Sequence, residues 1–313
     1  MSAWKILLTD GLEENGKAIL RASAEVVDQP GITAEDLLKV VGEYDALIVR
    51  GRTKVTPEVF AAGKKLKVVG RAGVGVDNIN LPAAKESKVT VVNSPLATTV
   101  AVAELTMGLM LSSVREIARA DASMKAGKWL KKEFEGAELC GKTLGVIGFG
   151  RIGSAVAARA KAFEMKILAY DPLISADEIK KRGGEPATLD EIYQNADFIT
   201  MHMPLTADSK GMLNAEAFGK MKQGVYIVCA ARGGVIDEAA LLDALNSGKV
   251  AGAALDVFSV EPPGLTDLVA HPKVTCTPHI GAQTVEAQTR AANDIAEEVL
   301  NALNDKPLRW KVA

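Results

Sequence analysis

Three ionisable residues near the C-terminus are of the types that transfer protons and bind organic acids: Arg232, Glu261 and His279. Oxidation of a hydroxyl to a carbonyl needs an acceptor for the alcohol proton, and imidazole serves this purpose best near neutral pH. A carboxylate beside the imidazole would orient the ring and favour its charged form. A guanidinium binds a carboxylate through two hydrogen bonds. Together the three types indicate redox chemistry on a hydroxy acid, although a single histidine or an Arg-Gly-Gly turn also occurs for purely structural reasons.

A glycine-rich turn at 148–153, with the sequence Gly-Phe-Gly-Arg-Ile-Gly, follows an apolar run and precedes an alanine-rich stretch. Glycines at this spacing let the chain turn tightly, let a pyrophosphate approach the backbone, and let helix and strand touch. The start of the following helix supplies N–H donors to an anion. This context predicts dinucleotide binding by Gly148, Gly150, Arg151, Ile152 and Gly153.

Asp171 lies eighteen residues beyond the last of these glycines, at the end of the next predicted strand. A carboxylate there accepts hydrogen bonds from both ribose hydroxyls and repels a 2′-phosphate, so the sequence favours NAD over NADP. The alternative is that Asp171-Pro172 only begins a turn, as this dipeptide often does.

These residues must be positioned by the elements around them. The chain alternates short β-branched runs with longer stretches rich in Ala, Lys and Glu, which is typical of βαβ units around a buried parallel sheet. In the first hundred residues, strands are predicted at 5–9, 25–28, 46–49, 67–70 and 90–93, and helices at 14–22 and 34–40, the latter capped by Thr33.

A second series of alternating elements begins near residue 142 and predicts another α/β domain. Its strands are predicted at 143–148, 166–170, 198–201, 225–229, 252–256 and 274–277, and a final helix at 285–303 carries small or apolar residues at every fourth position. Because the carboxyl ends of parallel strands gather at one edge, the loops holding Arg232, Glu261 and His279 are expected to meet there.

Between the two series, residues 99–119 predict one long, broadly apolar helix, followed by an irregular arm at 124–140. A helix with so few polar faces must be buried. It fits either the core of the protein or a contact with a second subunit, and the sequence leaves both open.

Composition excludes several classes of function. The 37 basic and 39 acidic residues give a formal charge of −2, which argues against nucleic-acid binding and against attraction to an acidic membrane. No apolar run is long enough for a membrane span. Three cysteines without a spacing pattern predict reduced thiols and no metal site. The N-terminus has no visible targeting segment, so a cytoplasmic location is expected.

The sequence resembles the D-isomer-specific 2-hydroxyacid dehydrogenase family over nearly the full chain. The motifs that carry the resemblance occur in the family's order at 148–153, at 197–205 (Asp-Phe-Ile-Thr-Met-His-Met-Pro-Leu), at 230–237 (Ala-Ala-Arg-Gly-Gly-Val-Ile-Asp), at 252–258 (Gly-Ala-Ala-Leu-Asp-Val-Phe) and at 278–282 (Pro-His-Ile-Gly-Ala).

The resemblance implies a fold and a role for each residue of the site. Two doubly wound parallel-sheet domains are expected: a discontinuous, flavodoxin-like substrate domain at 1–97 and 285–313, and a Rossmann NAD-binding domain at 98–284. Arg232 is then expected to bind the 2-oxo acid, His279 to act as acid and base, and Glu261 to pair with it. The expected cofactor contacts beyond the glycine turn and Asp171 are Met203, Pro204, Ala230, Ala231, Asp256, Gly281 and Ala282.

Within the family, the text at 49–56, 69–78 and 171–175 most resembles the members that oxidise 3-phospho-D-glycerate to 3-phosphohydroxypyruvate for serine biosynthesis. Such a substrate carries two anionic groups, and cations from the first domain would pair with them. The substrate contacts expected there are Arg50, Arg71, Gly73 and Val74. Solvated arginines near strand ends are the alternative.

Thr98 and Ala101 depart from the family's pattern, because they stand where Asn and Ser are frequent in a substrate-facing loop. Two other functions are therefore kept. One is a hydroxypyruvate or glyoxylate reductase, or another D-2-hydroxyacid dehydrogenase, which needs fewer cations. The other is an NADH-sensing interaction protein on the same fold. The expected partner is a small 2-hydroxy or 2-oxo acid, with assembly as a homodimer or homotetramer.

Overall fold

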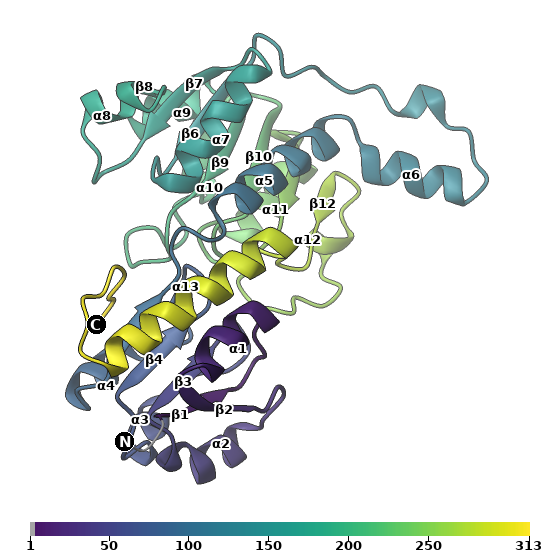
Figure 1. The fold of residues 1–313 in the computed structure, drawn as a ribbon. Coiled ribbons are helices and arrows are strands. Elements are labelled where there is room, and N and C mark those ends of the chain that lie inside the picture. Colours follow the sequence, from purple (N-terminus) through teal and green to yellow (C-terminus); the bar gives the residue numbers. More distant parts are fainter. Residues whose placement is uncertain (1–3) are drawn as a thin grey trace. The chain divides into compact units, whose positions relative to one another are not determined.

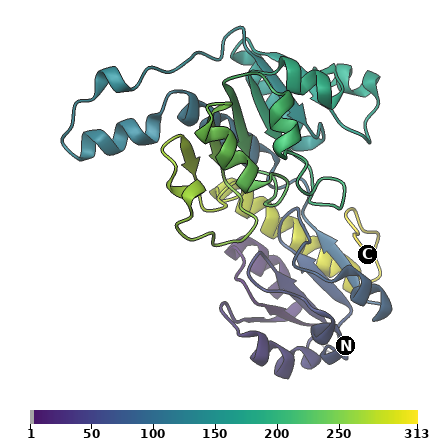
Figure 2. The ribbon, with the colours of Figure 1, turned by 180° about the vertical axis from the view of Figure 1, so that it is seen from behind.

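The computed structural model describes residues 4–313, which divide into two compact units. The first unit contains the chain as far as Thr98 together with Ala282–Ala313, and the second contains Thr99–Gly281. Each unit is an α/β layer structure built on one parallel sheet. In both views, the C-terminal helix α13 (Val285–Leu303) lies with the N-terminal strands of the first unit (Figure 1 and Figure 2).

The first unit has a five-stranded sheet in the order β2-β1-β3-β4-β5, with every neighbouring pair parallel. This is the flavodoxin-like order, whose switch point lies between β1 and β3. Its other elements, in chain order, are β1 (Trp4–Leu8), α1 (Glu14–Arg21), β2 (Ala24–Asp28), α2 (Ala34–Val40), η1 (Val41–Glu43), β3 (Ala46–Val49), α3 (Pro57–Ala62), β4 (Val68–Arg71), α4 (Leu81–Glu86) and β5 (Thr90–Asn93).

Helices cover both faces of this sheet. Ile6 and Leu8 of β1 point to the face covered by α1 and α13, whereas Leu7 points to the face covered by α2, α3 and α4. Two glycines allow the close packing of α13. A Cβ at Gly16 of α1 would approach the carbonyl oxygen of Ala292 to 2.6 Å, and one at Gly70 of β4 would approach Val299 to 2.6 Å. The predicted final helix is confirmed, with its buried stripe against the first sheet.

The second unit has a seven-stranded sheet in the order β12-β11-β10-β9-β6-β7-β8. Counted from β6, this is the Rossmann order with one added strand, and its switch point lies between β6 and β9. The fold class predicted from the sequence is therefore confirmed. The strands are β6 (Thr143–Ile147), β7 (Lys166–Tyr170), β8 (Glu185–Pro186), β9 (Phe198–Met201), β10 (Val225–Cys229), β11 (Val250–Leu255) and β12 (Val274–Cys276).

The helices of the second unit also form two layers. One face carries a core of α5, α7 and α8 side chains, and the other a core from α9, α10, α11 and α12. These helices are α5 (Thr99–Val114), α7 (Arg151–Ala162), α8 (Ala176–Lys181), α9 (Leu189–Asn195), α10 (Ala215–Lys220), α11 (Glu238–Asn246) and α12 (Asp267–Ala270).

The predicted single helix at 99–119 is confirmed as far as Val114 and is wrong in continuing unbroken beyond it. α5 ends at Val114, and α6 (Ile117–Lys125) begins after Glu116, whose φ of 51° is left-handed and ends the helical path. Part of the predicted irregular arm is therefore helical, and it includes a short turn η2 (Lys131–Glu133). α6 projects from the rest of the second unit in both views (Figure 1 and Figure 2). No helix within residues 4–313 is long and apolar enough to cross a membrane.

Candidate active site

His279 and Glu261 meet at the carboxyl edge of the second sheet, in the loops that follow β12 and β11. The Nδ1 atom of His279 lies 2.7 Å from Oε2 of Glu261. A carboxylate accepts hydrogen bonds only, so Nδ1 carries the proton and Nε2 is the nitrogen available to a reacting hydroxyl. Oε1 of Glu261 accepts a hydrogen bond from the backbone N–H of Phe258 at 3.1 Å, which fixes the carboxylate.

The His279 backbone adopts a left-handed conformation, with φ of 53°. Such a conformation costs a non-glycine residue about 1–3 kcal/mol and persists only where the surroundings impose it. Its own N–H donates to the carbonyl of Thr277 at 3.0 Å. Half of the His279 side chain remains exposed, so the ring stays accessible while its backbone is held.

Asp256 holds the loop that carries His279. It is 1% exposed, and both of its oxygens accept hydrogen bonds from this loop. Oδ1 accepts from the Thr277 hydroxyl at 2.6 Å and the Ile280 N–H at 2.8 Å, and Oδ2 accepts from the Gly281 N–H at 2.8 Å. The carboxylate that the sequence suggested as a cofactor contact therefore also positions the imidazole.

Arg232 lies in the loop after β10, the strand next to β11. Gly233 allows this loop to press against the next one, because a Cβ there would approach the Phe258 carbonyl oxygen to 1.8 Å. The guanidinium donates to the carbonyl of Ala231 at 2.6 Å. The contact through Gly233 brings the loop of Arg232 against the backbone that anchors Glu261.

The glycine-rich turn lies between β6 and the N-terminus of α7. Gly148 has φ of 89°, and a Cβ there would approach the His202 carbonyl oxygen to 2.6 Å. A Cβ at Gly153 would overlap the carbonyl oxygen of Gly148, so helix and turn touch. A Cβ at Gly150, the N-cap of α7, would meet nothing within 4 Å. The backbone is thus open at the place where an anion would approach the helix N-terminus, and the turn fits a dinucleotide pyrophosphate.

Asp171 follows β7 beside this turn. Its Oδ2 accepts from the Phe149 N–H at 2.8 Å, and its Oδ1 accepts from the Leu173 N–H at 2.9 Å. The side chain therefore begins a turn, as one of the two predicted interpretations has it, and it also contacts the glycine-rich segment. A carboxylate has about four acceptor positions, so two remain for ribose hydroxyls.

His202, at the end of β9, is a buried imidazole beside the same turn. Its Nε2 lies 3.0 Å from the Thr200 hydroxyl, and its Nδ1 is shielded from solvent without a hydrogen-bond partner. Burial lowers the pKa of His202 to about 3. The ring is therefore neutral at physiological pH and unsuited to a proton-transfer role.

In the first unit, two side chains clamp the loop that carries Arg50. Asp10, which follows β1, accepts from the backbone N–H of Arg50 at 2.8 Å and of Thr53 at 3.1 Å. Asn78 donates to the carbonyls of the same two residues, at 3.0 and 2.7 Å. Asp10 also accepts from the Thr53 hydroxyl at 2.5 Å and pairs with Arg52 at 3.2 Å. The loop is thus fixed at the switch point of the sheet.

Arg71 ends β4, and Gly73 makes room for its side chain. A Cβ at Gly73 would lie 1.5 Å from Nη1 of Arg71, and the φ of 146° also favours glycine. Nη1 donates to the carbonyl of Ala72 at 2.8 Å. The carbonyl of Val74 accepts from the Asn93 side chain at 2.7 Å, so this predicted substrate loop is held by β5.

The other residues expected at the site fall in segments next to those above. Met203 and Pro204 follow β9 and its His202, and Ala230 and Ala231 follow β10. Arg151 and Ile152 form the first turn of α7. Ala282 begins the return to the first unit. The two departures from the family pattern, Thr98 and Ala101, are 4% and 5% exposed.

Residues 4–313 contain no cluster of three or more His, Cys, Asp or Glu that could hold a metal ion. Sequence reasoning missed three polar residues that hold the site loops: Asp10, Asn78 and Thr277. Asp10 directly follows a predicted strand, and that placement was the one signal that could have identified it. The partners of the other two depend on contacts between distant segments.

Comparisons with known proteins agree with this geometry. A family model described as "D-isomer specific 2-hydroxyacid dehydrogenase, NAD binding domain" matches residues 107–281. The chain is 51% identical over 301 residues to D-3-phosphoglycerate dehydrogenase 2, chloroplastic, of Arabidopsis thaliana, which covers 96% of this chain and 48% of that protein. It is 46% identical over 307 residues to D-3-phosphoglycerate dehydrogenase of Bacillus subtilis, covering 97% and 58%. The chain thus spans about half the length of the curated relatives it matches.

Solved structures match over nearly the whole chain. A glyoxylate reductase from Paecilomyes thermophila superposes with a TM-score of 0.92 at 30% identity, covering 100% of this chain and 99% of that one. The apo-structure of D-lactate dehydrogenase from Escherichia coli gives a TM-score of 0.87 at 28% identity, covering 99% and 100%. With its matched family model, its two parallel sheets and its glycine turn, the chain belongs to the D-isomer specific 2-hydroxyacid dehydrogenase family.

Proposed function

We propose that this protein is an NAD-dependent oxidoreductase that oxidises 3-phospho-D-glycerate to 3-phosphohydroxypyruvate. The observation that carries the chemistry is the 2.7 Å contact between His279 and Glu261 at the carboxyl edge of the second sheet. The substrate is suggested by the relatives named D-3-phosphoglycerate dehydrogenase, at 45–51% identity. We expect this reaction to serve serine biosynthesis.

In the oxidation direction, the C2 hydroxyl loses a proton and C2 loses a hydride. Nε2 of His279 takes the proton, and Glu261 stabilises the positive charge that the ring then carries. NAD supplies the hydride acceptor when it is bound. Arg232 binds the C1 carboxylate through its guanidinium and holds the substrate in one orientation. In the reverse direction, His279 returns the proton to the carbonyl oxygen.

Asp171 supports NAD as the cofactor in preference to NADP. Its remaining acceptor positions suit two ribose hydroxyls, and its charge would repel a 2′-phosphate. The expected result is much tighter binding of NADH than of NADPH, with the gap narrowed in Asp171→Ala. Fluorescence titration of both nucleotides tests this, and equal affinities in the unmodified protein would remove Asp171 from the argument.

The phosphate of the substrate needs cations beyond Arg232, because a buried anion without partners loses much of its hydration free energy. We assign this part to the first unit, through Arg50 and Arg71, with Gly73 and Val74 shaping the loop. The clamp of Asp10 and Asn78 around the Arg50 loop supports this assignment, since a binding arginine must be presented by a rigid backbone.

The decisive experiment follows nicotinamide absorbance with 3-phosphohydroxypyruvate, hydroxypyruvate and glyoxylate as alternative substrates. We expect the highest kcat/KM with the phosphorylated acid. Arg50→Met and Arg71→Met should each raise KM for that acid by about tenfold or more, because a charge-assisted hydrogen bond contributes about 1.5–3 kcal/mol. Turnover of hydroxypyruvate and glyoxylate, which have no phosphate, should change little in these variants.

Two outcomes would replace this proposal. Faster turnover of glyoxylate or hydroxypyruvate would assign the protein to the reductases, and buried Thr98 and Ala101 would mark the altered pocket. Binding of NADH without turnover of any 2-oxo acid would favour the NADH-sensing interaction protein.

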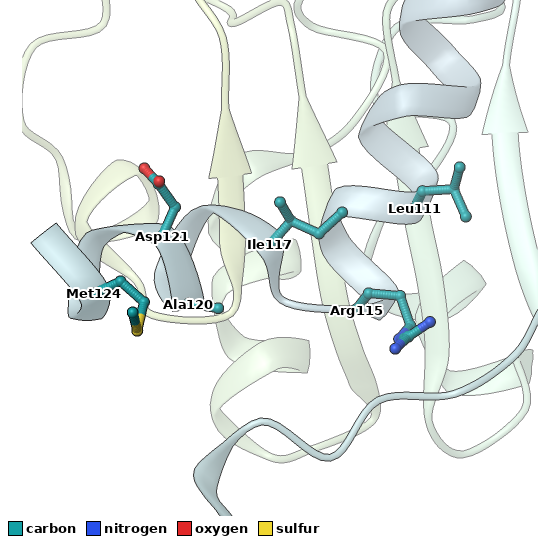
Figure 3. Close-up of a pocket in the computed structure, with 6 residues that line it drawn as sticks. All are labelled: Leu111, Arg115, Ile117, Ala120, Asp121 and Met124. Atoms are coloured by element: carbon teal, nitrogen blue, oxygen red, sulfur yellow. The ribbon is translucent and has the colours of Figure 1, made fainter. Parts of the chain in front are cut away.

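The projecting helix α6 supports self-association. None of its residues is buried, and Ile117 and Met124 are more than half exposed. A groove of about 480 Å³ lies along the end of α5 and α6. Figure 3 labels the six residues that line it: Leu111, Arg115, Ile117, Ala120, Asp121 and Met124. Exposed apolar side chains that lie close together, such as Ile117 and Met124, are typical of interfaces between subunits and support this proposal. We propose a homodimer or homotetramer, and Ile117→Glu should lower the molar mass measured by sedimentation equilibrium.

A further inference from the structure

Gln288 uses both ends of its amide, and the two partners lie in different segments of the first unit. Its Oε1 accepts a hydrogen bond from the guanidinium of Arg50, and its Nε2 donates to the carbonyl of Ala282 at 2.6 Å. A guanidinium can only donate and a carbonyl can only accept, so these partners fix which way the amide points. Gln288 is therefore a bridge between Arg50 and Ala282.

The first partner, Arg50, is held at three points. Its N–H donates to Asp10, its carbonyl accepts from Asn78, and its guanidinium contacts Gln288. An exposed arginine side chain loses about 2 kcal/mol of rotamer entropy when it is fixed. A guanidinium that is already fixed before the substrate arrives avoids most of this loss.

Arg52, two residues further along the same loop, has a charged partner, whereas the partner of Arg50 is the uncharged amide of Gln288. Arg52 pairs with the carboxylate of Asp10 at 3.2 Å, which offsets its charge. Gln288 offers Arg50 an oxygen without a negative charge. Arg50 is oriented and still keeps its full positive charge for an anion.

The second partner, Ala282, directly follows Gly281 and comes three residues after His279. The N–H of Gly281 is held by Asp256, and the carbonyl of the next residue is held by Gln288. Gln288 is thus anchored on a backbone carbonyl at the start of the C-terminal segment of the first unit.

We propose that Gln288 is a positioning residue that keeps the Arg50 guanidinium ready for the anionic tail of the substrate, with its own amide anchored on the carbonyl of Ala282. This inference rests on the proposed function only in taking Arg50 as a substrate contact. Because Gln288 acts through Arg50, its removal should matter only while Arg50 is present.

The test is a double-mutant cycle in the full chain, with steady-state kinetics on 3-phosphohydroxypyruvate. Gln288→Met keeps the length of the side chain and removes both hydrogen bonds. We expect its KM to rise about three- to tenfold, as for the loss of an ordinary hydrogen bond, with kcat changed less than about twofold. In the Arg50→Met background the same substitution should leave KM unchanged.

Gln288→Glu provides a sharper variant, because it keeps the shape and the acceptor but adds the charge that would neutralise Arg50. Its KM should rise more than that of Gln288→Met. Gln194→Glu is the matched control: it makes the same substitution at an exposed position of α9 in the other unit and should leave KM unchanged.

Equal KM increases from Gln288→Met with and without Arg50 would overturn the inference, since a residue with a merely structural role adds its effect independently. A fall in kcat and melting temperature without a change in KM would also overturn it. Failure of the proposed function has a different signature, which is a wild-type preference for glyoxylate or hydroxypyruvate. In that case the inference about Gln288 is overturned as well, because neither of those acids has a second anionic group for Arg50 to bind.

Discussion

Each unit contains an aspartate at the carboxyl edge of its sheet whose side chain is buried, and the two side chains are bonded alike. Asp10 in the first unit and Asp256 in the second each accept two backbone N–H groups and one threonine hydroxyl. They differ in what their loops carry, because Asp10 holds the loop of Arg50 and Asp256 holds the loop of His279. They also differ in charge balance, since Asp10 has an ion pair with Arg52.

This comparison separates binding from proton transfer. In both units a carboxylate holds a loop. The loop of the first unit carries the Arg50 cation, and the loop of the second carries the His279 imidazole on a left-handed backbone. A cation acts through its charge over some distance, whereas an imidazole must approach the reacting hydroxyl at hydrogen-bond distance. We therefore expect substitutions in the first unit to change KM and those in the second to change kcat.

The largest effect is expected for His279→Ala, which removes the proton acceptor from the second loop. The value of kcat should fall by about two to four orders of magnitude, the usual contribution of a general base. NADH affinity should remain close to that of the wild type. Stopped-flow absorbance gives kcat and fluorescence titration gives the affinity. A lower NADH affinity with an unchanged kcat would contradict the role of His279 as acid and base.

Asp256→Asn should come next, because it removes an acceptor while retaining the shape of the side chain. One amide N–H₂ would then face an N–H or O–H donor of the His279 loop, and the imidazole would shift. Misplacement by about 1 Å can cost about a hundredfold in kcat. A weaker NADH affinity with normal kcat would show instead that Asp256 acts mainly on the cofactor, as the sequence alone suggested.

Asp10→Asn breaks the corresponding loop of the first unit, where a change in KM is expected. We expect KM for 3-phosphohydroxypyruvate to rise by about tenfold, because at least one charge-assisted hydrogen bond to the Arg50 loop is lost. The value of kcat should change far less than in Asp256→Asn. Steady-state kinetics on Asp10→Asn and Asp256→Asn in parallel tests this difference. Similar changes of KM and kcat in the two variants would contradict the separation of binding from proton transfer.

The smallest effect concerns His202, a strand-end residue that has one hydrogen-bond partner and no charge. Its folded-state pKa of about 3 is below the usual 6.5, so the stability that it contributes is present above pH 6.5 and is lost as the pH falls towards 3. Between pH 7 and pH 5.5, the wild type should lose about 1 kcal/mol more unfolding free energy than His202→Asn. Urea unfolding at both pH values measures this difference, and equal losses in the two proteins would contradict the buried neutral ring.

The sequence by itself determined the periodic elements and the order of the motifs. Strands such as Ala46–Val49 and the helix Val285–Leu303 were predicted to the residue, because β-branched runs and an apolar residue at every fourth position reflect local geometry. The helix break at Glu116 was missed, since no glycine or proline marks it and a left-handed glutamate has no pattern of its own.

Only the tertiary structure decided how the chemical groups are held. The partners Asp10 and Arg50 are separated by 40 positions in the chain, and Arg50 and Gln288 by 238. Hydrogen bonds over such separations exist only after the parallel strands bring their ends to one edge, so no local pattern encodes them. The residue types of the site could be read from the sequence, whereas the clamp around Arg50 and the support of His279 by Asp256 follow from the packing of the sheets.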